Sequence, residues 1–164
     1  MKSKLAALAC GALFGSALLP GHAGATGANG VVGEPLAPGS LPEPIRIKLK
    51  ADHSGGFEDG TSVAQISMIK YTIQPGGYFG WHTHGGPVWV VVAAGALTLY
   101  DGDDAACTGH KQMAGSAFLD PGDHVHNARN EGTVPVVVYA TFLLPAGAPA
   151  RIDAPAPNPN VCGF

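Results

Sequence analysis

Short apolar runs, many alternating with polar residues, follow one another along the central part of the chain. A period of two places every second side chain on the same face of a β-strand. No segment carries a sustained apolar stripe with helical spacing. The pattern predicts strands over residues 45–50, 63–73, 87–93, 96–100, 117–119, 125–128 and 134–144, and another around residue 111. We therefore expect an all-β fold.

The first 25 residues show a different pattern. Lys2 and Lys4 precede an apolar run over residues 5–19, and the small residues Ala23 and Ala25 follow. This order is typical of a secretory signal peptide. A membrane anchor is the alternative, but it needs about 20 apolar residues, and this run is shorter. We expect cleavage after Ala25 and a secreted or periplasmic protein.

The regions on either side of the predicted strands are rich in proline. Residues 26–44 contain Pro35, Pro38, Pro42 and Pro44 and have almost no periodic pattern. Because proline lacks a backbone N–H, we interpret this region as a flexible Gly/Pro-rich linker. Residues 45–144 form the predicted domain, and residues 145–164 form an extended Pro-rich C-terminal tail across its surface.

Composition agrees with one small β domain. The chain has 164 residues, 24 glycines and 14 prolines, and only 13% of its residues are charged. The formal charge is −3, and it becomes −5 once Lys2 and Lys4 are removed with the signal peptide. There is no basic cluster, so we expect no nucleic-acid partner and no membrane contact after cleavage. Small molecules, metals and proteins remain as candidate binding partners.

Cleavage would leave two cysteines, Cys107 and Cys162, in an oxidising compartment. A disulfide is the ordinary fate of such a pair. The alternative is a thiol pair that serves metal or redox chemistry, but the chain has no C-x-x-C spacing. We expect a bridge that ties the C-terminus to an internal loop.

Three histidines have the spacing of metal ligands. His82 and His84 lie two apart, which in a strand directs both side chains to one face. His126 follows on a later predicted strand and could complete a site of three nitrogens. The intervals Gly76-x5-His82-x-His84 and Gly115-x5-Pro121-x4-His126-x3-Asn130 resemble the two motifs of the cupin superfamily. The resemblance implies a single cupin jelly-roll barrel with its core over residues 60–144.

The chain departs from the family pattern at two positions. Val88 stands where the family usually places a glutamate ligand, and Asp123 stands where the second motif has a glycine. Gly122 is adjacent and can absorb the unusual backbone angles there. By parity Val88 faces the same pocket as the histidines. Three neutral imidazoles would leave a divalent metal its full charge, which favours an anionic ligand.

Other side chains are candidates for the surroundings of the metal. His124 shares the parity of His126 and could be a fourth donor, an outer-shell partner or a rim residue. Tyr100 and Tyr78 could be outer-shell donors, although strand tyrosines are more often packing residues. None of the three arginines is aimed at the pocket by any sequence feature. We expect Asn130 to make structural hydrogen bonds in a turn or at a strand edge.

The resemblance implies one divalent transition metal, namely iron, manganese, nickel, copper or zinc, with iron favoured. Cupins that lack the glutamate include iron dioxygenases with three histidine ligands, so we expect an oxidoreductase that acts on a small anionic substrate. The alternatives are a binding module that uses its metal without turnover, and a structural envelope protein with a vestigial site. Dimerisation through sheet edges is a further expectation.

Overall fold

A computed structural model describes residues 26–48, 60–157 and 159–164. These residues form ten β-strands and no helix, so the all-β prediction is confirmed. The predicted signal peptide lies outside the described residues. Within the described ranges, no helix is long and apolar enough to cross a membrane. The strands are β1 (Asn29–Ile47), β2 (Thr61–Tyr78), β3 (His82–Thr83), β4 (Val88–Ala94), β5 (Ala96–Asp101), β6 (His110–Met113), β7 (Ala117–Asp120), β8 (His126–Arg129), β9 (Val136–Leu144) and β10 (Ile152–Asp153).

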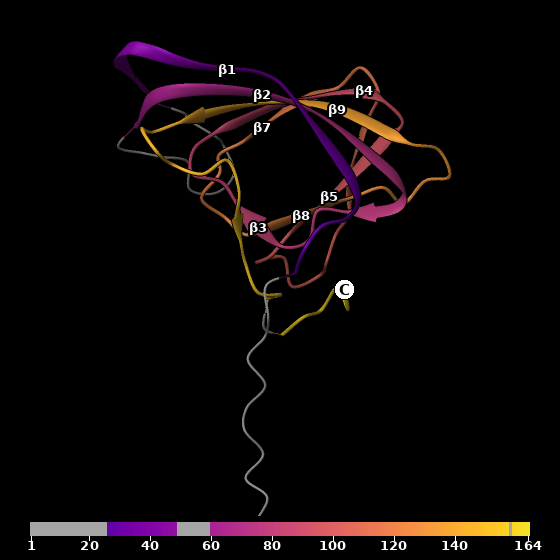
Figure 1. Cartoon of the computed structure of the whole chain (residues 1–164). Coiled ribbons are helices and arrows are strands. Elements are labelled where there is room, and N and C mark those ends of the chain that lie inside the picture. The colour runs from indigo at the N-terminus through magenta and orange to yellow at the C-terminus, as the bar shows by residue number, and fades with distance from the viewer. Residues whose placement is uncertain (1–25, 49–59, 158) are drawn as a thin grey trace, which may run out of the picture.

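The strands wrap into a nearly closed antiparallel barrel, as expected for a jelly roll. One path of paired strands runs β10-β3-β8-β2-β9-β4-β7, and β5 continues from β8 to β6. In Figure 1 the strands β2, β9, β4 and β7 form one wall, and β3, β8 and β5 lie on the opposite side. Strand β3 carries His82, with His84 directly after its end, and β8 carries His126, so this second wall positions the predicted site.

The interior is filled by the alternate residues of β4 and β9. In β4, Val88, Val90 and Val92 are buried, whereas Trp89 and Val91 are exposed. In β9 the residues 136, 138, 140 and 142 are buried with the same period. The period of two in the sequence therefore corresponds to one inward and one outward face, as predicted.

The linker prediction for residues 26–44 is wrong. These residues belong largely to β1, which pairs antiparallel with β2 along its length. Among the described residues β2 is the only strand that β1 pairs with, so one edge of β1 makes no ladder and tolerates proline. The register shifts between Pro35 and Ala37 and between Ser40 and Ile45, and the second shift contains two further prolines.

The C-terminal residues 145–164 lie on the second wall of the barrel, and we call them the C-terminal strap. Strand β10 pairs with β3, so that Asp153 lies opposite His82. Trp81 is fully buried beneath the strap, and its indole Nε1 donates to the carbonyl oxygen of Phe164 at 3.0 Å. Cys107 and Cys162 form the expected disulfide, which fixes the strap to the loop after β5.

Candidate metal centre

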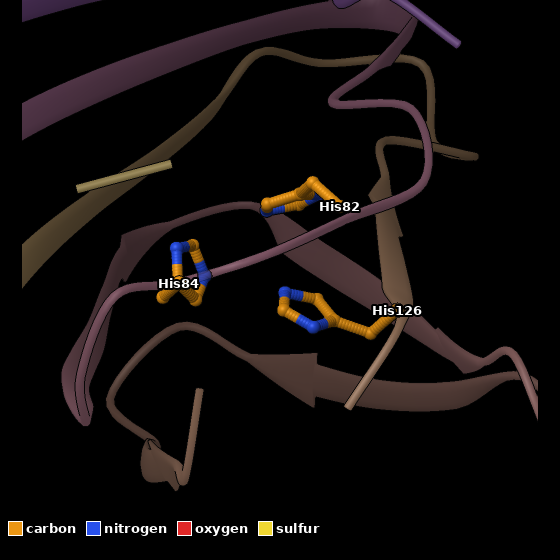
Figure 2. Close-up of side chains that lie close together, drawn as sticks. All are labelled: His82, His84 and His126. Atoms are coloured by element: carbon orange, nitrogen blue, oxygen red, sulfur yellow. The ribbon is translucent and has the colours of Figure 1, made fainter. Parts of the chain in front are cut away.

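Two neighbouring strands bring the three predicted histidines together. His82 in β3 and His126 in β8 are direct register partners, and His84 follows two residues after His82. The ring centroids are 4.3 to 5.0 Å apart. One nitrogen of each ring lies within 4.8 Å of the other two. Figure 2 shows the three rings facing a common space between the strands.

The protonation of each imidazole is fixed by its Nδ1 atom. Nδ1 of His82 donates to the carbonyl oxygen of Gly80 at 2.8 Å, and Nδ1 of His84 donates to that of Ala150 at 2.7 Å. Nδ1 of His126 lies 3.2 Å from the carbonyl oxygen of His124. A carbonyl oxygen only accepts, so in a neutral ring the proton sits on Nδ1. The three Nε2 lone pairs are then available to a metal, and the partners of Nδ1 hold the rings in place.

Burial keeps these rings neutral. Desolvation, with the neighbouring imidazoles, lowers the pKa of His82 to about 2. Burial likewise lowers the pKa of His84 and of His126 to about 4. Because metals bind the unprotonated imidazole, the site is ready to accept a cation at neutral pH.

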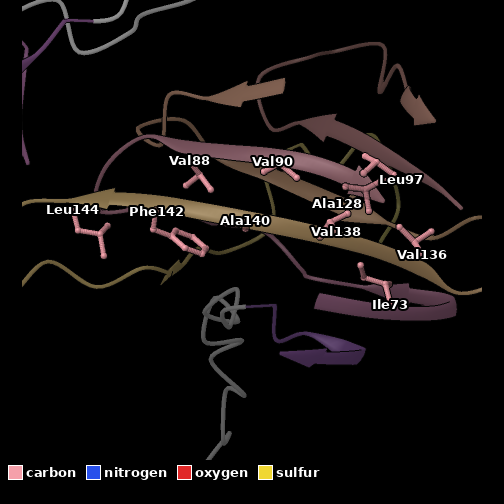
Figure 3. Close-up of a cluster of buried hydrophobic side chains, with 11 residues drawn as sticks. Ile73, Val88, Val90, Leu97, Ala128, Val136, Val138, Ala140, Phe142 and Leu144 are labelled. Atoms are coloured by element: carbon pink, nitrogen blue, oxygen red, sulfur yellow. The ribbon is translucent and has the colours of Figure 1, made fainter. Parts of the chain in front are cut away.

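The histidines border a small cavity with apolar walls. The cavity has a volume of about 60 Å³, which is room for about four to six water molecules. Figure 3 shows Val88, Val90, Val138 and Phe142 among the core side chains that form its wall. Val88 faces the cavity, as its parity predicts.

A carboxylate that the sequence did not indicate lies in the site. Asp120 ends β7, is 8% exposed, and lines the cavity. Its Oδ2 is 3.0 Å from Nε2 of His126 and 3.9 Å from Nε2 of His84. Its Oδ1 accepts the backbone N–H of Gly122 at 2.7 Å. Burial raises the pKa of the Asp120 carboxyl, and the electrostatic interaction with the nearby His84 partly offsets this effect. The cavity therefore contains a carboxylate beside the three predicted imidazoles.

An arginine also lines the cavity, although no sequence feature directed one there. Arg151 comes from the C-terminal strap. Its Nη2 donates to the carbonyl oxygen of Phe79 at 2.8 Å, and its Nε donates to Asp153 at 2.6 Å. Its Nη1 is buried and has no hydrogen-bond partner among the residues that the structure describes. Its position in the strap, outside both histidine motifs, gave no signal in the sequence.

The other candidates for the surroundings lie at different distances from the cavity. His124 contributes its carbonyl oxygen to His126, while its Nε2 lies 3.2 Å from Asp101. That hydrogen bond raises the pKa of His124. Tyr100 donates to Glu131 at 2.5 Å, and Tyr78 packs against Arg129. Neither tyrosine is among the residues that line the cavity.

The turn of the second motif explains how the chain tolerates Asp123. Gly122 has a φ of 97°, and a Cβ there would lie 2.4 Å from the carbonyl oxygen of Gly86. The residue that must be glycine is therefore Gly122, directly before the motif position that Asp123 holds, as predicted. The carbonyl oxygen of Gly122 accepts the N–H of His84 at 2.8 Å, so this turn also positions a candidate ligand. Asn130 is buried and donates to Ile73 and Val134, which is the expected structural role.

Comparisons with known proteins agree with this architecture. The cupin domain model Cupin_2 matches residues 69–142. The polyketide cyclase RemF from Streptomyces resistomycificus is 13% identical with a TM-score of 0.55, over 84% of this chain and 80% of RemF, which shows a shared fold. The Cupin_2 domain of an XRE family transcriptional regulator from Enterobacter cloacae is 18% identical with a TM-score of 0.46, over 71% of this chain and 99% of that domain.

The oxalate decarboxylase from Lactobacillus farciminis, crystallised as a formate complex, is 24% identical with a TM-score of 0.46. The match covers 54% of this chain and only 26% of the decarboxylase. Curated proteins give no significant match. The matched family model spans all three histidines, and the barrel places them at one site. Residues 69–142 of this chain form a cupin domain.

Proposed function

We propose that this protein binds one divalent transition metal through Nε2 of His82, His84 and His126, and that it oxidises a small carboxylate-bearing substrate. One observation carries the metal site: each of the three Nδ1 atoms is paired with a backbone carbonyl, which leaves an unprotonated Nε2 on each of three rings that line one cavity. A bound divalent ion would supply Lewis acidity and, as iron(II), a place for dioxygen.

Arg151 supports an anionic substrate. Arg151 lines the cavity, its guanidinium donates to Phe79 and Asp153, and among the described residues its buried Nη1 has no hydrogen-bond partner. A buried N–H without an acceptor is costly, and a guanidinium binds carboxylates well. A substrate carboxylate would satisfy this donor and would bring the rest of the molecule towards the histidines.

The cavity limits the size and polarity of that substrate. Its volume is about 60 Å³, and valine, leucine and phenylalanine side chains form most of its wall. A molecule with a few heavy atoms beyond its carboxylate fits this space, and a large sugar or peptide does not. An apolar wall also excludes water from a reactive centre.

Oxygen consumption tests the proposal. The metal-free protein is loaded with Fe(II) without air and then mixed with a series of small carboxylic acids that carry a thiol, hydroxyl or keto group. We expect uptake of dioxygen with at least one member of the series. The Arg151→Met variant should raise KM for that substrate by roughly 10- to 150-fold, since a charge-assisted hydrogen bond is worth about 1.5–3 kcal/mol.

Two results would contradict the proposal in different ways. Fe(II) binding without oxygen uptake across the series would favour a binding module that uses its metal without turnover. An equal KM in the wild type and Arg151→Met would remove the role of the arginine. Arg129→Met is the matched control, because Arg129 lies over Tyr78 and Phe164 and not in the cavity.

The disulfide supports secretion or a periplasmic location, since such bonds persist in oxidising compartments. If the precursor is exported and cleaved after Ala25, the first residue of the resulting mature protein is Thr26. Mass spectrometry of the protein recovered outside the cytoplasm tests this step. A mature protein that still carries residues 1–25 would contradict it.

A further inference from the structure

We infer that Asp120 is a ligand of the proposed metal and replaces the carboxylate that β4 lacks. The inference rests on the proposed three-histidine site and adds a fourth donor from a different strand. Val88 and Asp120 are direct register partners on β4 and β7. The carboxylate of Asp120 therefore lies directly opposite Val88, the position where the family usually has its glutamate.

The distances within the site support coordination. Oδ2 of Asp120 lies 3.0 Å from Nε2 of His126. Since Nδ1 of His126 faces the carbonyl oxygen of His124, the neutral ring has a lone pair on Nε2. Two atoms that both bear lone pairs repel at this distance unless a cation or a proton lies between them. Two donors that share one metal with bonds of about 2.1 Å would lie roughly 3.0–3.4 Å apart, so the observed separation is compatible with shared coordination.

The position of the carboxylate is fixed by its other oxygen. Oδ1 accepts the backbone N–H of Gly122 at 2.7 Å, within a turn that glycine alone can form. Oδ2 is left to face His126 and His84. An orientation of this kind is what hydrogen bonds to a ligating carboxylate provide in metal sites.

This assignment changes the charge of the centre. A divalent ion with three neutral imidazoles and one carboxylate has a net charge of +1, and the guanidinium of Arg151 adds one positive charge beside it. The attraction for an anionic substrate is therefore divided between the metal and the arginine. The carboxylate also increases the number of donors to four, which strengthens retention of the metal.

Zinc and cobalt binding to the full mature protein test the inference. Affinity is measured by competition with a chelator, and the visible spectrum of bound Co(II) reports the ligand set. We expect Asp120→Asn to weaken Zn(II) binding by at least 100-fold and to change the Co(II) spectrum. We expect the double variant Asp120→Asn with Val88→Glu to recover at least tenfold, because it returns a carboxylate to the facing position. Asp123→Asn, an exposed change in the same turn, should alter neither measurement.

The outcomes separate this inference from the metal site itself. If Asp120→Asn binds Zn(II) as tightly as the wild type and gives the same Co(II) spectrum, Asp120 is not a ligand and the three histidines remain. If His82→Ala also leaves binding unchanged, the proposed metal site fails as well. Infrared difference spectra of the wild type require no variant. A shift of a carboxylate band on Zn(II) binding is expected, and its absence would overturn the assignment even if Asp120→Asn failed to fold.

Discussion

The length of the loop that the disulfide between Cys107 and Cys162 closes predicts how much this bond stabilises the protein. The two cysteines are 55 residues apart in sequence. Closing a loop of this size removes about 14 cal/mol/K of entropy from the unfolded chain, which amounts to about 4 kcal/mol at 25 °C. The perturbation is the double variant Cys107→Ser and Cys162→Ser, which opens the loop and keeps side chains of similar size.

We expect a large fall in thermal stability. For a protein of this size, 1 kcal/mol corresponds to about 2–4 °C in Tm, so the loss of about 4 kcal/mol should lower Tm by about 8–16 °C. Circular dichroism with and without a reducing agent measures the change. The reducing agent should lower the Tm of the wild type to that of the double variant and leave the double variant unchanged.

The reasoning would be refuted by a specific result. If thiol titration shows full reduction of the wild type and its Tm falls by less than about 3 °C, the bridge lowers the entropy of the unfolded chain only slightly. The strap would then be held by its other contacts, which include the pairing of β10 with β3 and the packing of Trp81 against Phe164.

Three further predictions concern the residues around the site. Below about pH 6.5 the metal-free protein should lose stability as the pH falls, because the three buried histidines bind protons in the unfolded chain but not in the folded one; the loss is up to about 1.4 kcal/mol per pH unit for each histidine. The buried carboxylate of Asp120 opposes part of this loss. A Tm that does not change between pH 7 and pH 5 would contradict the prediction. Gly122→Ala should cost more than about 2 kcal/mol, since its Cβ meets a backbone oxygen at a positive φ, whereas Gly115→Ala has a positive φ in open space and should cost less; equal Tm values would be inconsistent with this contact. Asn130→Ala should lower the free energy of unfolding in urea by about 3 kcal/mol, because buried backbone groups lose their partners, and a change under 1 kcal/mol would assign those groups to other partners.

The sequence was sufficient to predict features that depend on local spacing. The period of two in residues 88–92 indicated which side chains face inward, and the buried valines of β4 agree. The interval between His82 and His84 predicted a shared face, and the second motif selected His126. These predictions succeed because side-chain direction along a strand depends on position alone.

The features that the sequence did not reveal depend on contacts between distant segments. Asp120 becomes a site residue because β7 pairs with β4 in one particular register. Arg151 reaches the cavity because the strap folds back across β3. The prolines of β1 suggested a linker, since the sequence does not show that one edge of that strand lacks a partner.

Metal content is the most direct measurement of the central claim. The protein without its predicted signal peptide, residues 26–164, is stripped of metal, titrated with Fe(II) without air or with Zn(II), and analysed for bound metal after removal of the excess. We predict one equivalent per chain in the wild type, and loss of most of it in His82→Ala and in His126→Ala, with the far-ultraviolet circular dichroism of the barrel retained. A wild type that binds no metal, or histidine variants that retain a full equivalent, would contradict the account.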